Sequence, residues 1–309
     1  MKKSVKLTSA SLIAAFAVGG GLLSVGKSPF LSGLLAALAA LVLLPLAEWA
    51  ASSVFRDGEV GIWRRILFSV TVVVATVTAS SAASGFSSFV AHSMLSGVSP
   101  FAVKIIFLFL AAYLAFLGRD AVKKFSLVAF LMIVTVAAVL FVLSAESLDF
   151  ARIKELFSED LSFSGVAKEL VGMFVPSTLA VIYLSLGRAE KRTGGVLLAV
   201  VLSSALLILC RLNVSLLLGD SLSAAVEYPY SEAVSTVTAG KLFARLEGWA
   251  YLMYYAAAAV RASVCLSLSC RLFCEIFPSA GRKRLVPTLL PFTLGALSLI
   301  DVTNLSPFS

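Results

Sequence analysis

Long apolar stretches alternate with short polar ones along the whole chain. Nine stretches are long and apolar enough to cross a bilayer, at 7–27, 30–55, 66–91, 101–118, 125–145, 166–187, 194–219, 246–273 and 285–303. No polar block between them is long enough to fold separately. The pattern therefore predicts an all-α, polytopic membrane protein, with about nine transmembrane helices in a single domain, residues 1–309.

The first predicted helix contains three consecutive glycines, Gly19, Gly20 and Gly21, near its middle. Each glycine costs a helix about 1 kcal/mol relative to alanine. Backbone that leaves the helix at membrane depth is tolerated only where it is buried in protein or lines a cavity. The triplet indicates either close packing against a neighbouring helix or a broken helix that presents backbone groups to a small ligand.

The sixth predicted helix has an interruption of its own, which runs from Gly172 through Val175 to Pro176. Proline removes a backbone hydrogen bond and clashes with the preceding turn, although such a proline is often only a kink. The first and sixth helices hold corresponding positions in two five-helix halves. Paired interruptions of this kind indicate a binding site at the interface between two repeats.

Hydroxyl groups recur every fourth residue in the third predicted helix, at Ser80, Ser84 and Ser88. These three residues therefore share one face of the helix. One interpretation is a central helix that packs closely against its neighbours. The other is a wall of hydroxyls beside a small polar ligand, and both can hold together.

The eighth predicted helix has a polar stripe, because six residues recur at alternating intervals of four and three: Glu247, Tyr251, Tyr254, Ala258, Arg261 and Cys265. Arg261 lies near the middle of the span. An arginine there costs at least about 2.5–3.5 kcal/mol unless it is paired or hydrated, so it is expected to face the protein interior. Its role is either structural, or that of a cation near the ligand or in place of a metal ion.

Composition and charge support this topology. The chain is 60% hydrophobic and only 14% charged, with a net charge of +8, whereas a soluble domain is about 25% charged. Basic residues gather in alternate loops, which is the pattern of cytoplasmic loops and predicts that the N-terminus is cytoplasmic. The positive net charge is therefore explained without a nucleic acid partner. The apolar run of 7–27 is long enough to span, which favours a retained helix over a cleaved signal peptide. Arg211, in the seventh span, is expected to snorkel outward.

The sequence offers little catalytic or metal-binding chemistry. His92 is the only histidine, and the four cysteines, at 210, 265, 270 and 274, lie in or at the end of apolar spans. They are interpreted as small buried apolar residues. No nucleophile with a base, no metal cluster and no phosphate loop is found. We therefore expect no enzyme activity, no metal and no cofactor.

One segment resembles a known family. The motif Tyr228-Pro229-Tyr230 is followed by Gly240-Lys241-Leu242-Phe243-Ala244-Arg245-Leu246-Glu247 and a long apolar span. This arrangement is similar to the B subunit of bacterial spore germinant receptors, the GerAB-type endospore germination permeases. These proteins belong to the amino acid–polyamine–organocation transporter superfamily. The interruptions at the glycine triplet and at Pro176 agree with the resemblance, which covers most of the chain.

The resemblance implies a five-plus-five inverted-repeat, LeuT-like fold, here without its tenth helix. It also implies a nutrient ligand such as an amino acid, held midway across the spore inner membrane, with receptor A and C subunits as partners. Gly19 to Gly21 would present amides to the ligand carboxylate, helped by the positive end of an outer half-helix. Carbonyls from Gly172 to Val175 would receive the ammonium group, and Arg261 would replace a bound sodium ion.

Three functions are consistent with the sequence. The first is a nutrient-sensing receptor subunit that triggers germination. The second is a secondary amino acid transporter, coupled to protons or independent of ions. The third is a structural membrane subunit that binds no ligand. The expected ligand-binding residues are Gly19, Gly20, Gly21, Ser84, Gly172, Val175, Pro176, Tyr254 and Arg261.

Overall fold

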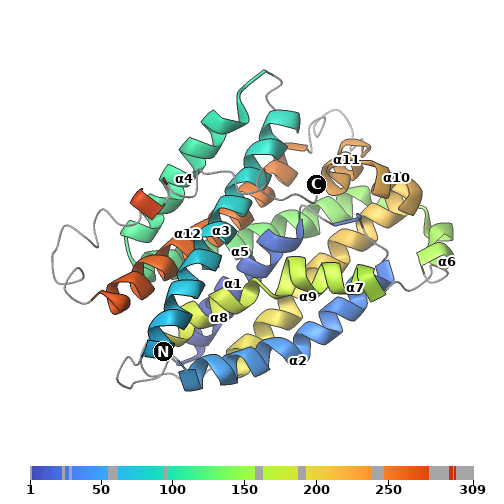
Figure 1. Ribbon diagram of the computed structural model, residues 1–309. Coiled ribbons are helices and arrows are strands. Elements are labelled where there is room, and N and C mark those ends of the chain that lie inside the picture. The colour runs from blue at the N-terminus through green and yellow to red at the C-terminus, as the bar shows by residue number, and fades with distance from the viewer. Residues whose placement is uncertain are drawn as a thin grey trace.

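The computed structural model describes residues 2–22, 25–27, 30–54, 62–93, 97–156, 163–186, 193–237, 247–277, 292–294 and 296. These residues form helices joined by turns, and no strand occurs among them (Figure 1). The all-α prediction is therefore confirmed for the part of the chain that the structure describes.

Seven long helices make up most of the molecule: α1 (Lys2–Gly21), α2 (Phe30–Val54), α3 (Ile62–Ser93), α4 (Pro100–Phe116), α5 (Arg119–Ser144), α9 (Thr193–Leu218) and α12 (Glu247–Ile276). Among the described residues, six segments are long and apolar enough to cross a membrane, namely Phe30–Ser53, Ile62–Ser93, Arg119–Ser147, Phe163–Ser185, Gly195–Leu218 and Gly248–Ile276. Leu7–Gly21 and Pro100–Phe116 are shorter apolar helices. Together they match the first eight predicted spans. The ninth, 285–303, lies almost entirely outside the described residues.

The sixth span is built from three pieces: α7 (Phe163–Glu169), the π-helix η4 (Leu170–Phe174) and α8 (Ser177–Ser185). The backbone N–H of Val175 reaches five residues back, to the carbonyl of Leu170 at 2.9 Å. Pro176 has no N–H, so it cannot donate the bond that an α-helix would give to the carbonyl of Gly172. The predicted interruption is confirmed, and proline is its physical cause.

The first span differs from its prediction. α1 is helical through the whole triplet and ends at Gly21. Residues 25–27 form a turn with Gly26 at φ 90°, and α2 begins at Phe30. No outer half-helix follows the triplet in the described part of this link, so the expected positive helix end is wrong. The triplet therefore forms the C-terminal end of α1, where the helix dipole is negative.

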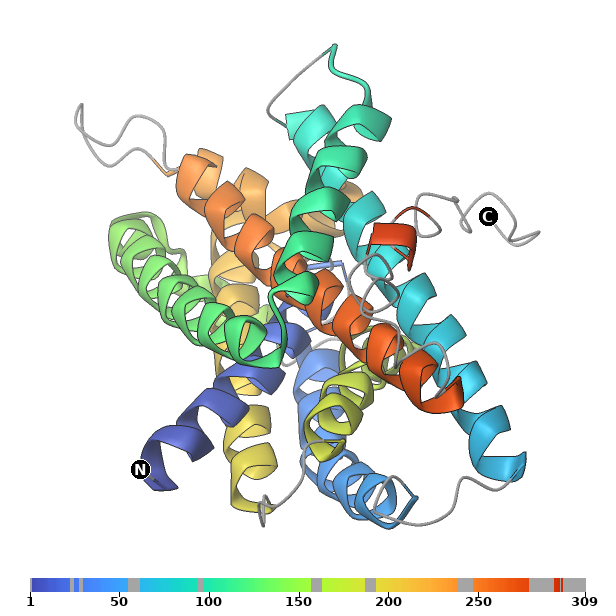
Figure 2. The same cartoon turned by 90° about the vertical axis from the view of Figure 1, so that its left-hand side faces the viewer.

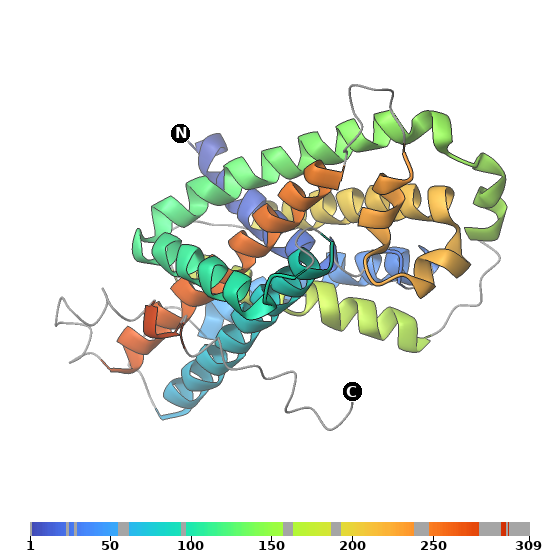
Figure 3. The same cartoon turned by 90° about the horizontal axis from the view of Figure 1, so that it is seen from above.

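Short helical elements follow α5 and α9. η2 (Ala145–Ser147), η3 (Phe150–Arg152) and α6 (Ile153–Leu156) follow α5, and α10 (Asp220–Ala225) and α11 (Pro229–Ser235) follow α9. Figure 3 shows α10 and α11 beside α9, and α11 also packs against α12.

Two helices, α1 and α12, occupy the centre of the bundle. α12 packs against α1, α3, α4, α5, α8 and α11, and Figure 2 shows it crossing the middle of the molecule. In its most apolar window, 78% of α12 is buried, against 33–56% for the other long spans. Apolar side chains such as Trp49, Val73 and Phe109 are exposed on the outer helices, as expected for an integral membrane protein in a bilayer. Most residues in the middle of α1 and α12 are therefore shielded from lipid, although Leu7, Trp249 and Leu252 are exposed.

Candidate functional site

The three glycines at the end of α1 allow it to approach other elements closely. A Cβ atom on Gly19 would lie 2.5 Å from the carbonyl oxygen of Ala257 in α12. One on Gly20 would lie 2.5 Å from Nη1 of Arg261 and 3.3 Å from the carbonyl oxygen of Gly172. One on Gly21 would lie 3.0 Å from Met173 and Leu207. Close packing and a candidate site thus coincide at the same helix end.

Arg261 reaches this helix end from α12. It is 9% exposed, and its guanidinium carbon lies 5.7 Å from the ring centre of Phe16. Among the described residues it makes no hydrogen bond and no ion pair, and its Nε is buried without a partner. The carbonyl end of α1 and the carbonyl of Gly172 offer it only partial negative charge. The arrangement can bind an anionic group.

Tyr254 lies two turns before Arg261 on the same face of α12, about 10 Å along the axis. Its ring packs against Phe89, with centroids 4.3 Å apart, and lies 6.5 Å from the ring of Tyr230. Its hydroxyl is buried and has no hydrogen-bond partner in the part of the chain that the structure describes. The polar stripe predicted for this helix therefore places two unpartnered polar groups, Tyr254 and Arg261, in the protein interior.

The structure does not bring all the predicted residues to this point. Ser84 is half-buried in α3, and the row of hydroxyls is split, because Ser80 is buried whereas Ser88 is exposed. The Val175 side chain is 47% exposed. Its carbonyl accepts hydrogen bonds from the backbone N–H and hydroxyl of Thr178, at 3.1 and 2.7 Å. The geometry gathers Gly19, Gly20, Gly172 and Arg261, with Pro176 acting through the carbonyl of Gly172.

A buried ion pair lies on the other side of η4. Arg211 of α9 donates from Nη2 to Oε1 of Glu169 at 2.5 Å, and both side chains are about 95% buried. Its guanidinium lies directly against Gly33, where no Cβ would fit. The expectation that Arg211 snorkels outward is wrong, because Glu169 offers a partner in the interior. A carboxylate at the start of one span and an arginine within the next were the only sequence signals for this pair.

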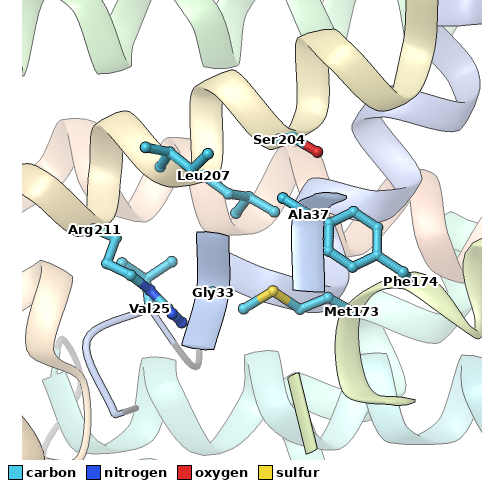
Figure 4. Close-up of a pocket in the computed structure, with 9 residues that line it drawn as sticks. Val25, Gly33, Ala37, Met173, Phe174, Ser204, Leu207 and Arg211 are labelled. Carbon is cyan, nitrogen blue, oxygen red and sulfur yellow. The ribbon is translucent and has the colours of Figure 1, made fainter. Parts of the chain in front are cut away.

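The ion pair borders a narrow cavity between the end of α1, α2, η4 and α9. In Figure 4, Arg211 points toward Gly33, while Leu207 and Met173 approach each other across the space. The hydroxyl of Ser204, on α9, is buried and finds no hydrogen-bond partner within the described ranges. The lining consists of Val25, Gly33, Ala37, Met173, Phe174, Ser204, Leu207, Ile208 and Arg211.

Aromatic residues cover the Tyr254 side of the site. Phe89 packs against Tyr228, Tyr251 and Tyr254, with ring centroids 4.3–5.2 Å apart. Burial raises the pKa of the Tyr228 phenol well above its ordinary value, and the hydrogen bond and charge of Glu227 raise it further. Tyr228 therefore stays neutral at physiological pH, and this cover is apolar and uncharged at its centre.

Tyr183 of α8, which is fully buried, is the centre of a polar cluster. The guanidinium carbons of Arg119 and Arg271 lie 5.9 and 5.7 Å from its ring centre, and Ser267 donates to its hydroxyl at 3.2 Å. Arg119 also donates to the carbonyl of Leu184 at 2.9 Å. We call these four residues, Arg119, Tyr183, Ser267 and Arg271, the Tyr183 clasp. It fastens α8 to α5 and α12.

Metal-binding chemistry is sparse in the described ranges. No group of three or more histidine, cysteine, aspartate or glutamate side chains is close enough there to hold a metal ion. The four cysteines are free thiols. Cys210 and Cys265 are fully buried, whereas Cys270 and Cys274 are half-buried.

No known family profile and no curated protein sequence matches the chain. Among solved structures, the chain is similar to a Na⁺-coupled sialic acid symporter in its substrate-bound, outward-open state. The TM-score is 0.68 at 12% identity, and the match covers 97% of this chain and 73% of the symporter. The chain has a LeuT-like transporter fold. At this identity the similarity establishes the fold alone, the LeuT-like architecture of an integral, multi-pass membrane protein.

Proposed function

We propose that this chain binds a small solute with a carboxylate, such as an amino acid, where α1 ends against η4 and α12. One observation carries the proposal: Arg261 is buried and has no ion-pair partner among the described residues. An uncompensated charge in such a place costs several kcal/mol. A ligand carboxylate would offset that cost, and Arg261 is the group that would bind it.

The ligand's ammonium group would bind to carbonyl oxygens. The C-terminal end of α1 carries partial negative charge, and the carbonyl of Gly172 loses the donor that Pro176 cannot supply. Both lie beside Gly20. A zwitterionic head group would therefore meet a cation on α12 and carbonyls on α1 and η4. The unpartnered hydroxyl of Tyr254 lies two turns further along α12 and is available to the same ligand.

We infer that the ligand is sensed rather than moved, and that the chain is the nutrient-sensing subunit of a spore germinant receptor. The Tyr228-Pro229-Tyr230 motif and the Arg245-Leu246-Glu247 entry to α12 support this inference by their resemblance to that family. In that role the chain sits in the spore inner membrane with its N-terminus in the cytoplasm, and associates with receptor A and C subunits. Deleting its gene would abolish the response to one nutrient, and tagged protein would co-purify the two subunits.

The alternative is a secondary transporter for amino acids, which the similarity of the fold to a symporter favours. Purified protein in liposomes separates the two. Fast, gradient-driven amino acid uptake would overturn the sensing proposal and support the transporter. Binding without uptake would support the sensor. A chain that binds no amino acid at all would be a structural subunit.

The binding proposal is tested by equilibrium binding of radiolabelled amino acids to the purified full-length protein. Arg261→Gln is expected to weaken binding at least tenfold, because the charged hydrogen bond to the carboxylate is lost. Arg261→Lys keeps the charge and is expected to retain part of the affinity. Unchanged affinity in a monodisperse Arg261→Gln protein would reduce Arg261 to a packing role.

A further inference from the structure

The narrow cavity beside η4 shares a border with the proposed head-group site. Gly20 faces Arg261, while its neighbour Gly21 faces Leu207 and Met173. These last two residues line the cavity. A ligand lying across the end of α1 would therefore have its head group on the α12 side and the rest of its structure on the α9 side.

The walls of the cavity are mostly apolar: Val25, Ala37, Met173, Phe174, Leu207 and Ile208. The one cation among them, Arg211, is already neutralised by Glu169. A second negative charge on the ligand would compete with Glu169, and a positive charge would be repelled by Arg211. The chemistry of the walls therefore fits an uncharged, apolar group.

The space can be enlarged to accept such a group. The space is about as large as one water molecule. Met173 and Leu207, whose flexible ends lie nearest Gly21, separate it from the head-group site. Methionine adapts readily to a neighbour, so a shift of these two side chains joins the two spaces.

We propose that this cavity is the side-chain subsite for the ligand, and that the ligand is a neutral amino acid with an apolar side chain of moderate size, such as valine, leucine or methionine. The proposal rests on the proposed function, because it assumes that the head group binds at Arg261. It adds the substrate class and assigns its recognition to α2, α9 and η4. Ala37 and Gly33, one turn apart on α2, provide the room.

The test compares leucine with glycine, which has the same head group and no side chain. Binding of each to the purified full-length protein is measured for the native chain, for Ala37→Leu and for Ala50→Leu. Ala37 is 5% exposed and lines the cavity, whereas Ala50 is exposed on the same helix. The two variants thus add the same atoms, inside and outside the subsite.

Leucine is expected to bind the native chain more tightly than glycine, glutamate or lysine. Ala37→Leu is expected to weaken leucine binding about tenfold or more, as crowding in an apolar pocket does, and to leave glycine within about twofold. Ala50→Leu is expected to change neither. If Ala37→Leu is not monodisperse, Ser204→Val fills the cavity from α9 and is subject to the same criteria.

Three results would overturn the subsite. The first is leucine affinity that Ala37→Leu leaves unchanged while glycine still binds, which leaves the head-group proposal standing. The second is equal loss of both ligands in a folded variant. The third is tighter binding of glutamate or lysine than of leucine. If no amino acid binds the native chain, the proposed function fails, and the subsite fails with it.

Discussion

At the scale of single residues, the glycine triplet has a separate reason at each position. Gly19 faces a backbone carbonyl of α12, which cannot give way. Gly20 faces a guanidinium, which can move, and Gly21 faces two flexible apolar side chains. Sequence alone left open whether the triplet packs closely against a neighbouring helix or breaks its own helix. Which group approaches each glycine depends on helix rotation, which a run of three identical residues does not encode.

Gly20→Ala is expected to weaken amino acid binding about tenfold, or about 1.4 kcal/mol, because its methyl group displaces Nη1 of Arg261. Gly172→Ala is the matched control. It lies at the same site, but a Cβ there meets nothing within 4 Å, so affinity is expected to stay within about twofold. Equilibrium binding measures both. Equal losses in the two variants would show that the methyl group does not act through Arg261.

The Arg211–Glu169 pair was not predicted, because its partners lie 42 residues apart and on different helices. Arg211→Met is expected to lower the free energy of unfolding by about 3–5 kcal/mol, since it removes one member of a buried ion pair. The double variant with Glu169→Leu is expected to recover most of that loss. Thermal unfolding in detergent measures both. A double variant no more stable than Arg211→Met would contradict the role of the pair.

At the scale of elements, the sixth span was predicted more accurately than the first. Pro176 changes the local hydrogen-bonding pattern wherever it stands, so the interruption follows from one residue. The end of α1 at Gly21 follows from no single residue, since glycine lowers helix stability without forbidding a helix. The short link before Phe30 limits the room for a second half-helix. The sequence therefore predicted the positive end of an outer half-helix at the triplet, whereas the structure has the negative, C-terminal end of α1 there.

The Tyr183 clasp is expected to hold α8, the second half of the sixth span, against α12. Tyr183→Leu removes the ring that Arg119 and Arg271 face and the acceptor for Ser267. We expect α8 to separate from α12 more often, and half-buried Cys270 to react severalfold faster with a maleimide in a Cys274→Ser background. Fully buried Cys265 is expected to stay unreactive.

Mass spectrometry of the labelled peptide identifies the thiol, and Cys270→Ser provides the blank. An unchanged Cys270 rate in Tyr183→Leu would show that Arg119 and its bond to the Leu184 carbonyl suffice to hold α8. A faster Cys265 rate would instead reveal general loosening of the helix bundle.

At the scale of the whole molecule, the long apolar stretches predicted an all-α protein with many membrane spans, whereas the LeuT-like fold was expected only from the resemblance of the segment around Tyr228-Pro229-Tyr230 to a known family. The pairing of side chains across helices was not predicted, because it depends on rotations of each helix that a membrane pattern leaves open. The central placement of α12 has a further consequence. Its Arg261 is a fixed cation at the point where α1, η4 and α12 meet.

Ligand binding is therefore expected to be independent of sodium. Replacing Na⁺ with choline at constant ionic strength should leave amino acid affinity within about twofold, because the guanidinium already supplies the positive charge at the end of α1. Parallel binding curves in the two salts measure this. A tenfold loss in choline would show that a sodium ion binds elsewhere in the chain.

A tethered cation also limits the work that the protein can do. A symporter draws energy from an ion that enters on one side and leaves on the other. The charge of Arg261 is bound covalently to the chain and returns with it, so over a full cycle it transfers nothing down an electrochemical gradient. Through this residue alone, the chain can report how much ligand is present, or let it equilibrate across the bilayer, but it cannot concentrate it.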